Sequence, residues 1–195
     1  MKKFITNKYI LYLIGVVSLL IIWILLAELI GDKYLIFPDP WMTFEYFGEL
    51  LGKNITYRYI GQTLFKLLLG FSFSFILGLI FGIIAGSNKH IAQAFKPIMS
   101  VLKSIPTACL VFLFLVISGA KNAPIFIVTL VSFPILYEAI LGGFINIDKS
   151  LIEATKVDGA NFARSLISVR IPQAMPYILV GLASSFALSF KIEIM

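Results

Sequence analysis

Apolar residues run through this 195-residue chain in long blocks that short polar segments separate. A helix needs about 20 mostly apolar residues to cross the hydrocarbon core of a bilayer. We therefore predict five membrane-spanning helices, the last one incomplete, at residues 10–30, 61–86, 97–118, 124–141 and from Pro172 onward. The runs are too long and uniform for barrel strands. The expected fold class is all-α, a polytopic transmembrane helical bundle.

Prolines and glycines mark where these helices should break or bend. Pro106 predicts a kink or break near Ile105, and Pro134 predicts a second kink. Residues 119–123 are expected to form a short turn. The stretch from Trp41 to Leu51 predicts a short amphipathic helix at the membrane surface. The last apolar run still continues at Met195, which indicates a truncated chain or a fragment of a longer protein.

Three glycines in the second apolar block recur at every fourth position, at Gly78, Gly82 and Gly86. This spacing puts them on one face of a helix and lets a neighbouring helix approach closely. Because neither a preceding strand nor a following Lys-Ser/Thr pair is present, helix packing is the better interpretation than a phosphate-binding loop.

Composition supports the membrane assignment, since 59% of the residues are hydrophobic and only 13% are charged. The net charge of +6 is better explained by basic residues that hold cytoplasmic loops in place than by a nucleic-acid-binding function. With a cytoplasmic N-terminus, most lysines and arginines fall on the inner side: Lys2, Lys3, Lys8, Lys89, Lys96, Lys103, Lys149, Lys156, Arg164 and Arg170. The outer side would carry only Lys33, Lys53, Arg58 and Lys121.

This orientation divides the chain into a first span with an extracytoplasmic segment, residues 1–60, and a core, residues 61–195. Within the core, the polar segment 142–172 is placed in the cytoplasm. Ser150 and Glu153 fit a capping box for a helix at 151–157. Gly159 suits the left-handed position after that helix, and Asn161 can cap a second short helix that runs to about Val169.

The first of these helices offers a small-to-medium apolar patch at Leu151, Ile152, Ala154 and Thr155. Such a helix can enter a groove on a soluble partner. It can also rest on lipid headgroups as a solvated amphipathic loop. The residues alone leave both interpretations open.

The segment from Glu153 to Pro172 resembles the EAA loop of permease subunits in bacterial ATP-binding-cassette (ABC) importers. Glu153 and Ala154 match that motif, Thr155 replaces its second Ala, and Gly159 falls at the right distance; Val169, Ile171 and Pro172 stand for its closing residues. Further stretches are similar to the nitrate/sulfonate/taurine branch: Pro38-Asp39-Pro40, Lys103-Ser-Ile-Pro106, Phe133-Pro134, residues 142–148 and Phe190-Lys191-Ile192-Glu193.

The resemblance implies a bacterial inner-membrane permease subunit that forms the pathway of an ATP-driven importer, for a small anion such as sulfonate, taurine or nitrate. It implies three protein partners: a cytoplasmic ABC ATPase, a second permease copy and an extracytoplasmic substrate-binding protein. The ATPase-coupling residues would be Glu153, Ala154, Thr155, Asp158, Gly159, Ile171 and Pro172. The chain has no P-loop, so ATP is expected on the partner and no cofactor or catalysis on this chain.

Charged residues inside apolar runs are candidates for the transport pathway. Glu138, Lys191 and Glu193 are the possible pathway residues. His90 has no Cys or His neighbour and Cys109 stands alone, so no metal site is expected. Two alternatives stay open: an ATP-independent secondary transporter or channel, which would favour an inverted repeat, and a truncated fragment without transport activity.

Overall fold

The computed structural model describes residues 8–34 and 38–194, and every regular element in these ranges is helical. This confirms the all-α fold class. The chain divides into two compact units, one up to Ile60 and one from Gly61 onward. Each unit is described separately below.

The first unit contains α2 (Lys8–Tyr34) and α3 (Pro40–Leu51). The predicted amphipathic helix at Trp41–Leu51 is confirmed and begins one residue earlier. Pro40 occupies its first turn, and the Asp39 side chain accepts a hydrogen bond from the Trp41 N–H at 3.1 Å. The Trp23 indole donates to the Pro38 carbonyl at 3.1 Å and so ties α2 to the start of α3.

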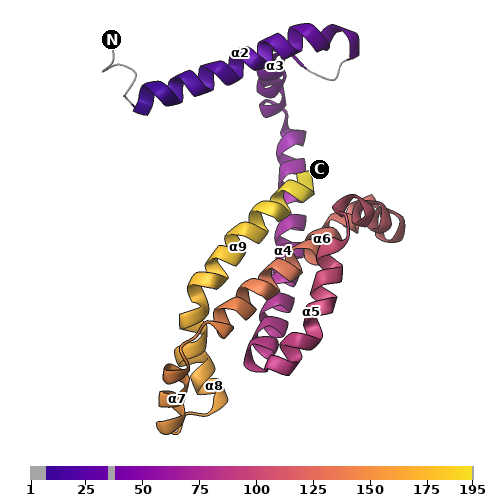
Figure 1. Cartoon of the computed structure of the whole chain (residues 1–195). Helices are drawn as coiled ribbons and strands as arrows, with labels where there is room; N and C mark the ends of the chain where they lie inside the picture. Colours follow the sequence, from indigo (N-terminus) through magenta and orange to yellow (C-terminus); the bar gives the residue numbers. More distant parts are fainter. Residues whose placement is uncertain (1–7, 35–37, 195) are drawn as a thin grey trace. The chain divides into compact units, whose positions relative to one another are not determined.

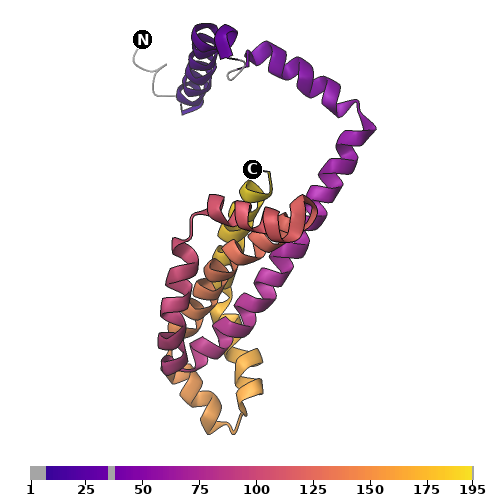
Figure 2. The same ribbon diagram turned by 90° about the vertical axis from the view of Figure 1, so that its right-hand side faces the viewer.

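The second unit is built on three long helices, α4 (Asn54–Ser87), α6 (Thr107–Ile145) and α9 (Ile171–Ile194). The first of them, α4, begins before Gly61 and continues into this unit. In the sequence, α5 (Lys89–Ser104) follows α4. Figures 1 and 2 both show α4, α6 and α9 side by side, with α5 next to α6. The segment between α6 and α9 lies at one end of this bundle in both views.

Four stretches of the described residues are long and apolar enough to cross a membrane: Lys8–Ile30, Asn54–Ser87, Thr107–Ile145 and Phe162–Ile194. Five separate spans are therefore not confirmed. The predicted third span, 97–118, is divided between α5 and α6 and is not a separate span. Pro97 lies inside α5, and α5 ends at Ser104 because Pro106 cannot continue it, which confirms the break expected at Ile105.

The predicted turn at 119–123 is a break at one residue. Gly119 has φ 71° and ψ 161°, and helix continues on both sides of it within α6. The segment from Thr107 to Ser118 is only about 18 Å long at 1.5 Å per residue, too short to cross the apolar core alone. The predicted third and fourth spans therefore share α6. Pro134 lies inside α6. The residue of α6 with non-helical backbone is Gly119.

The glycines of α4 lie directly against α6. A Cβ built on Gly78 would stand 2.8 Å from the Leu136 Cβ, and one on Gly82 would stand 2.7 Å from the Ile140 Cγ2. Gly86 meets Phe144 in the same way. Because no side chain fits at these positions, the two helix backbones pack in close contact.

Small residues also bring α9 against α6. A Cβ on Gly143 would lie 2.8 Å from the Ala174 Cβ. Higher in the same interface, the Ser132 and Ser189 hydroxyls share a hydrogen bond of 2.5 Å, and both side chains are fully buried. The apolar core near the loop end of this interface consists of Ile140, Phe144, Ile147, Ala174 and Ile178.

Candidate functional site

The segment between α6 and α9 begins with two polar caps. The Asn146 side chain donates to the Gly142 carbonyl at 2.8 Å and closes the end of α6. Asp148 then starts α7 (Lys149–Val157), because its carboxylate accepts from the Ser150 N–H at 2.9 Å. The backbone and side-chain hydrogen bonds from Ser150 hold the pKa of the Asp148 carboxyl below its ordinary value. The start of α7 is thus capped by Asp148, two residues before the predicted Ser150.

A sharp turn ends α7. Gly159 has φ 69°, the left-handed conformation predicted for it, and the Ala160 N–H bonds to the Thr155 carbonyl at 3.0 Å. This bond closes the end of the helix in the manner of a Schellman motif. The next residue, Asn161, accepts from the Arg164 N–H at 2.9 Å and caps α8 (Phe162–Ser165), as the sequence predicts.

The predicted second short helix does not stand apart from the last span. A π-helical turn, η1 (Leu166–Arg170), follows α8 directly and runs into α9. The Ile171 N–H bonds to the Leu166 carbonyl five residues back. Pro172 lacks an N–H, and its ring would clash with the carbonyl four residues earlier in a regular α-helix. The wider turn before Pro172 relieves that clash and keeps the helix continuous.

The two faces of α7 have different surroundings. Ile152 packs against the core formed by α6 and α9, and the Thr155 hydroxyl lies 3.2 Å from the buried Ser165 hydroxyl of α8. Glu153, Ala154 and Val157 are exposed, and Val157 keeps 87% of its surface open. The inner face therefore fixes α7 to the bundle, while the outer face is left without a protein neighbour among the described residues.

Further residues of the predicted coupling motif surround this helix. Asp158 and Gly159 are exposed in the turn, whereas Ile171 packs against the α6–α9 core and Pro172 is exposed in the first turn of α9. The Arg170 guanidinium lies over the Phe162 ring, 5.1 Å from its centroid, and holds α8 to η1.

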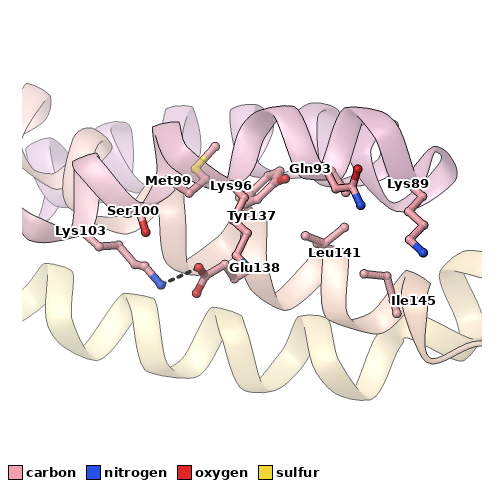
Figure 3. Close-up of a pocket in the computed structure, with 11 residues that line it drawn as sticks. Lys89, Gln93, Lys96, Met99, Ser100, Lys103, Tyr137, Glu138, Leu141 and Ile145 are labelled. Carbon is pink, nitrogen blue, oxygen red and sulfur yellow. Dashed lines mark hydrogen bonds and ion pairs between the residues drawn. The ribbon is translucent and has the colours of Figure 1, made fainter.

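The charged residues predicted inside the spans do not gather at this loop. Glu138 of α6 forms an ion pair with Lys103 of α5 at 2.5 Å, and both side chains remain nearly half exposed (Figure 3). Lys191 is exposed on α9, and Glu193 is partly buried near the opposite end of the bundle from α7. The three predicted pathway residues are thus split between two places.

Sequence reasoning missed two contacts in this unit. The Lys103–Glu138 pair joins residues 35 positions apart, and the Thr155–Ser165 bond joins the two sides of a turn. For the first pair, opposite charges in adjacent apolar helices were a usable signal. For the second contact, the sequence showed that Thr155 replaces an Ala of the motif. It did not show that Ser165 would be the partner of the Thr155 hydroxyl.

Comparison with known proteins places this architecture among transport proteins. Residues 78–195 match the model of the family described as "Binding-protein-dependent transport system inner membrane component". The chain is 25% identical over 170 residues to the putative aliphatic sulfonates transport permease protein SsuC of Bacillus subtilis, covering 87% of this chain and 62% of that protein. It is 30% identical over 135 residues to a probable ABC transporter permease protein of Brucella melitensis, covering 69% and 52%.

A third relative is the nitrate import permease protein NrtB of Synechocystis, 25% identical over 188 residues and covering 91% of this chain and 67% of that protein. A solved structure of the MetNI methionine ABC transporter in inward-facing conformations superposes with a TM-score of 0.60 over 68% of both chains, at 21% identity. That similarity concerns the fold. The chain spans 62% and 52% of the lengths of the Bacillus and Brucella relatives.

Proposed function

Because the chain belongs to the family of inner membrane components of binding-protein-dependent transport systems, a family of multi-pass membrane permease subunits, we propose that it couples transport to a separate cytoplasmic ABC ATPase through the outer face of α7. The chain would form part of the substrate pathway, and ATP would be bound and hydrolysed on the partner. The observation that carries this proposal is the exposed row Glu153, Ala154 and Val157 on a helix whose other face is held by the core.

The chemistry of that face favours a protein groove over a lipid surface. Val157 offers a nearly fully open apolar side chain, and the small Ala154 lets a partner backbone come close. Glu153 and Asp158 add exposed carboxylates on either side. The loop as a whole also carries Lys149, Lys156, Arg164 and Arg170, so the preference concerns this face alone: its two carboxylates would meet the negative charge of an anionic membrane surface.

The packing of α7 gives a route for movement. Ile152 contacts the core that α6 and α9 share, and Leu166 of η1 and Ile171 of α9 contact the same core. A displacement of α7 by a partner would therefore move the ends of two long helices. Such a shift requires a partner that binds two arrangements with different affinity, as closure of an ATPase pair on ATP would provide.

The proposals for the remaining partners and for the substrate are supported by the family and its relatives. We propose a second copy of the permease as a homodimer partner and an extracytoplasmic binding protein that delivers substrate. The relatives named for aliphatic sulfonates and nitrate favour a small anion such as sulfonate, taurine or nitrate. A relative from Escherichia coli is named for glycine betaine/proline betaine, so a zwitterion is the competing class. Glu138, Lys191 and Glu193 are the proposed pathway residues of this chain.

The test is co-purification of the full-length chain with its ATPase from membranes. Val157→Asp and Glu153→Lys change only exposed side chains of α7, and each is expected to reduce ATPase recovery about tenfold, since truncation or reversal at a contact costs more than about 1.4 kcal/mol. Lys121→Glu is the matched control. It reverses an exposed charge of α6 near Gly119, away from α7, and should leave ATPase recovery unchanged.

Two outcomes would count against docking at α7. Unchanged ATPase recovery with both α7 variants would remove α7 as the contact. Equal loss with Lys121→Glu would show a general effect of charge on expression or folding. Size-exclusion profiles of each purified variant separate folding from docking.

A further inference from the structure

A groove of about 460 Å³ lies between α5 and α6, apart from the outer face of α7 (Figure 3). Three lysines of α5 line it at intervals of seven residues: Lys89, Lys96 and Lys103. Seven residues make about two helical turns, so the three side chains lie along one side of α5. Lysines therefore recur along one side of the groove.

Only one of these charges is neutralised within the groove. Lys103 pairs with Glu138 at 2.5 Å, while Lys89 and Lys96 have no ion pair among the described residues. Both are exposed, and Figure 3 shows Lys89 at the opposite end of the groove from the Lys103–Glu138 pair. Two ammonium groups thus remain for an anionic ligand.

A buried hydroxyl in the same groove also lacks a partner. Tyr137 is 2% exposed, its ring stacks on Phe95 with centroids 5.9 Å apart, and its hydroxyl makes no hydrogen bond among the described residues. Buried polar groups are normally hydrogen-bonded. Tyr137 is one of the residues that line the groove, so its buried hydroxyl is an unpartnered donor for a ligand oxygen bound there.

The rest of the lining combines the polar Gln93 and Ser100 with an apolar wall of Ala92, Met99, Leu141 and Ile145. Ile145 is also the last residue of the candidate span Thr107–Ile145, so the groove lies at a membrane end of the bundle. A bare inorganic anion has no apolar part to contact an apolar wall. A phospholipid carries acyl chains close to its phosphate and can make that contact. Lysines between helices at headgroup depth are a usual means of holding such phosphates.

We propose that the α5–α6 groove binds the phosphate group of an anionic phospholipid, with Lys89 and Lys96 as the charge partners, the Tyr137 hydroxyl as a donor and the apolar wall against the acyl chain. The groove includes Glu138, which is also a proposed pathway residue, so lipid binding is measured without transported substrate and without the ATPase. The bound lipid would hold α5 against α6 at the side of the bundle that carries α7.

The test uses the full chain purified in a neutral detergent and titrated with dioctanoyl phosphatidylglycerol and, separately, with dioctanoyl phosphatidylcholine. The wild type is expected to bind phosphatidylglycerol more tightly. The pair Lys89→Gln with Lys96→Gln should weaken that binding roughly thirtyfold, because each lysine near an anionic headgroup contributes roughly fivefold. The pair Lys89→Arg with Lys96→Arg keeps both charges and should bind like the wild type.

Tyr137→Phe keeps the ring and removes only the hydroxyl, so it should weaken binding severalfold without altering the stacking on Phe95. The pair Lys53→Gln with Lys121→Gln removes two lysines outside the groove and should have no effect. Size-exclusion profiles show whether each variant is folded.

Phosphatidylglycerol binding that is the same in the Lys89→Gln, Lys96→Gln variant as in the wild type would overturn the proposal. Displacement of the lipid by inorganic phosphate, with the same lysine dependence, would also overturn it in favour of a free-anion site. Retention of the lipid in excess phosphate supports it.

Discussion

Small residues have different roles on two helix faces of the second unit, one on α4 and one on α7. On α4, Gly78 and Gly82 leave so little space that a Cβ would stand within 3 Å of α6. On α7, Ala154 sits between Glu153 and Val157 on a face that is exposed. Spacing along a helix shows which residues share a face, and the neighbours decide whether that face is covered: residues of α6 cover the glycines of α4, whereas Ala154 lies between the exposed Glu153 and Val157. The first face should therefore control folding, and the second should control association.

The largest expected effect is on the covered face. Gly82→Leu puts a side chain where Ile140 already lies 2.7 Å from the Cβ position. Overpacking of this kind costs about 1–3 kcal/mol or more, so the unfolding midpoint in detergent should fall by several degrees and expression should drop. Gly61→Leu is the matched control on the same helix, because a Cβ at Gly61 has no neighbour within 4 Å. Equal behaviour of the two variants would contradict the close α4–α6 contact.

A smaller effect is expected at the turn that presents the exposed face. Gly159→Val forces a β-branched residue into a left-handed conformation with φ 69°, at a cost of about 1–2 kcal/mol. Hydrogen exchange in the peptide 149–165 should speed up, while exchange in α4 and α6 stays the same. Gly159→Asn should change little, since Asn tolerates this conformation. Faster exchange throughout the long helices would show that the turn is part of the folding core.

The bond between the two sides of the loop should contribute less. Thr155→Val keeps the shape of the side chain and removes its contact with Ser165, 3.2 Å away. A hydrogen bond of this kind contributes about 0.5–1.5 kcal/mol. A double-mutant cycle of Thr155→Val and Ser165→Ala, read from the exchange of residues 149–165, should give a favourable coupling of that size. A coupling near zero would mean that the hydroxyls act separately.

The smallest effect concerns pH. Because the folded-state pKa of Asp148 is lowered from 3.8, its cap contributes fully above that ordinary value. The contribution is lost as the pH falls through the lowered pKa. The protection factor of the amides at the start of α7, which is the intrinsic exchange rate divided by the observed rate at the same pH, should therefore fall below about pH 4 in the wild type. Asp148→Asn, which has no carboxyl to titrate, should show a flat profile over the same range; an unchanged acid response would assign the effect to another group.

The amino-acid sequence was sufficient for the helical class, for the break before Pro106 and for the left-handed Gly159, because each depends on a local property of the backbone or of a long apolar run. It was not sufficient for the number of spans. Gly119 bends α6 with a single residue, and Pro172 is accommodated by a π-helical turn rather than by a new helix start. In both places a single residue decides whether the helix stops or continues, and the apolar pattern around it is the same in either case.

The candidate site shows the same limit. The capping box at Ser150 and Glu153 is a valid local pattern. However, Asp148 lies two residues earlier, and its carboxylate caps the helix instead. The pairing of Lys103 with Glu138 depends on how α5 folds back onto α6, which the local pattern does not contain. The cap at Asn161 and the turn at Gly159 were therefore predictable, whereas the choice of Asp148 over Ser150 and the pairs that meet across helices were not.

Cysteine accessibility along α7 tests the docking account most directly. In a Cys109→Ser background, single cysteines at positions 152, 153, 154 and 157 are labelled with a membrane-impermeant maleimide in inside-out vesicles, with and without the ATPase. Docking at the outer face predicts that the ATPase protects positions 153, 154 and 157, while position 152, which faces the core, labels slowly in both conditions. Equal labelling of position 157 with and without bound ATPase would contradict it.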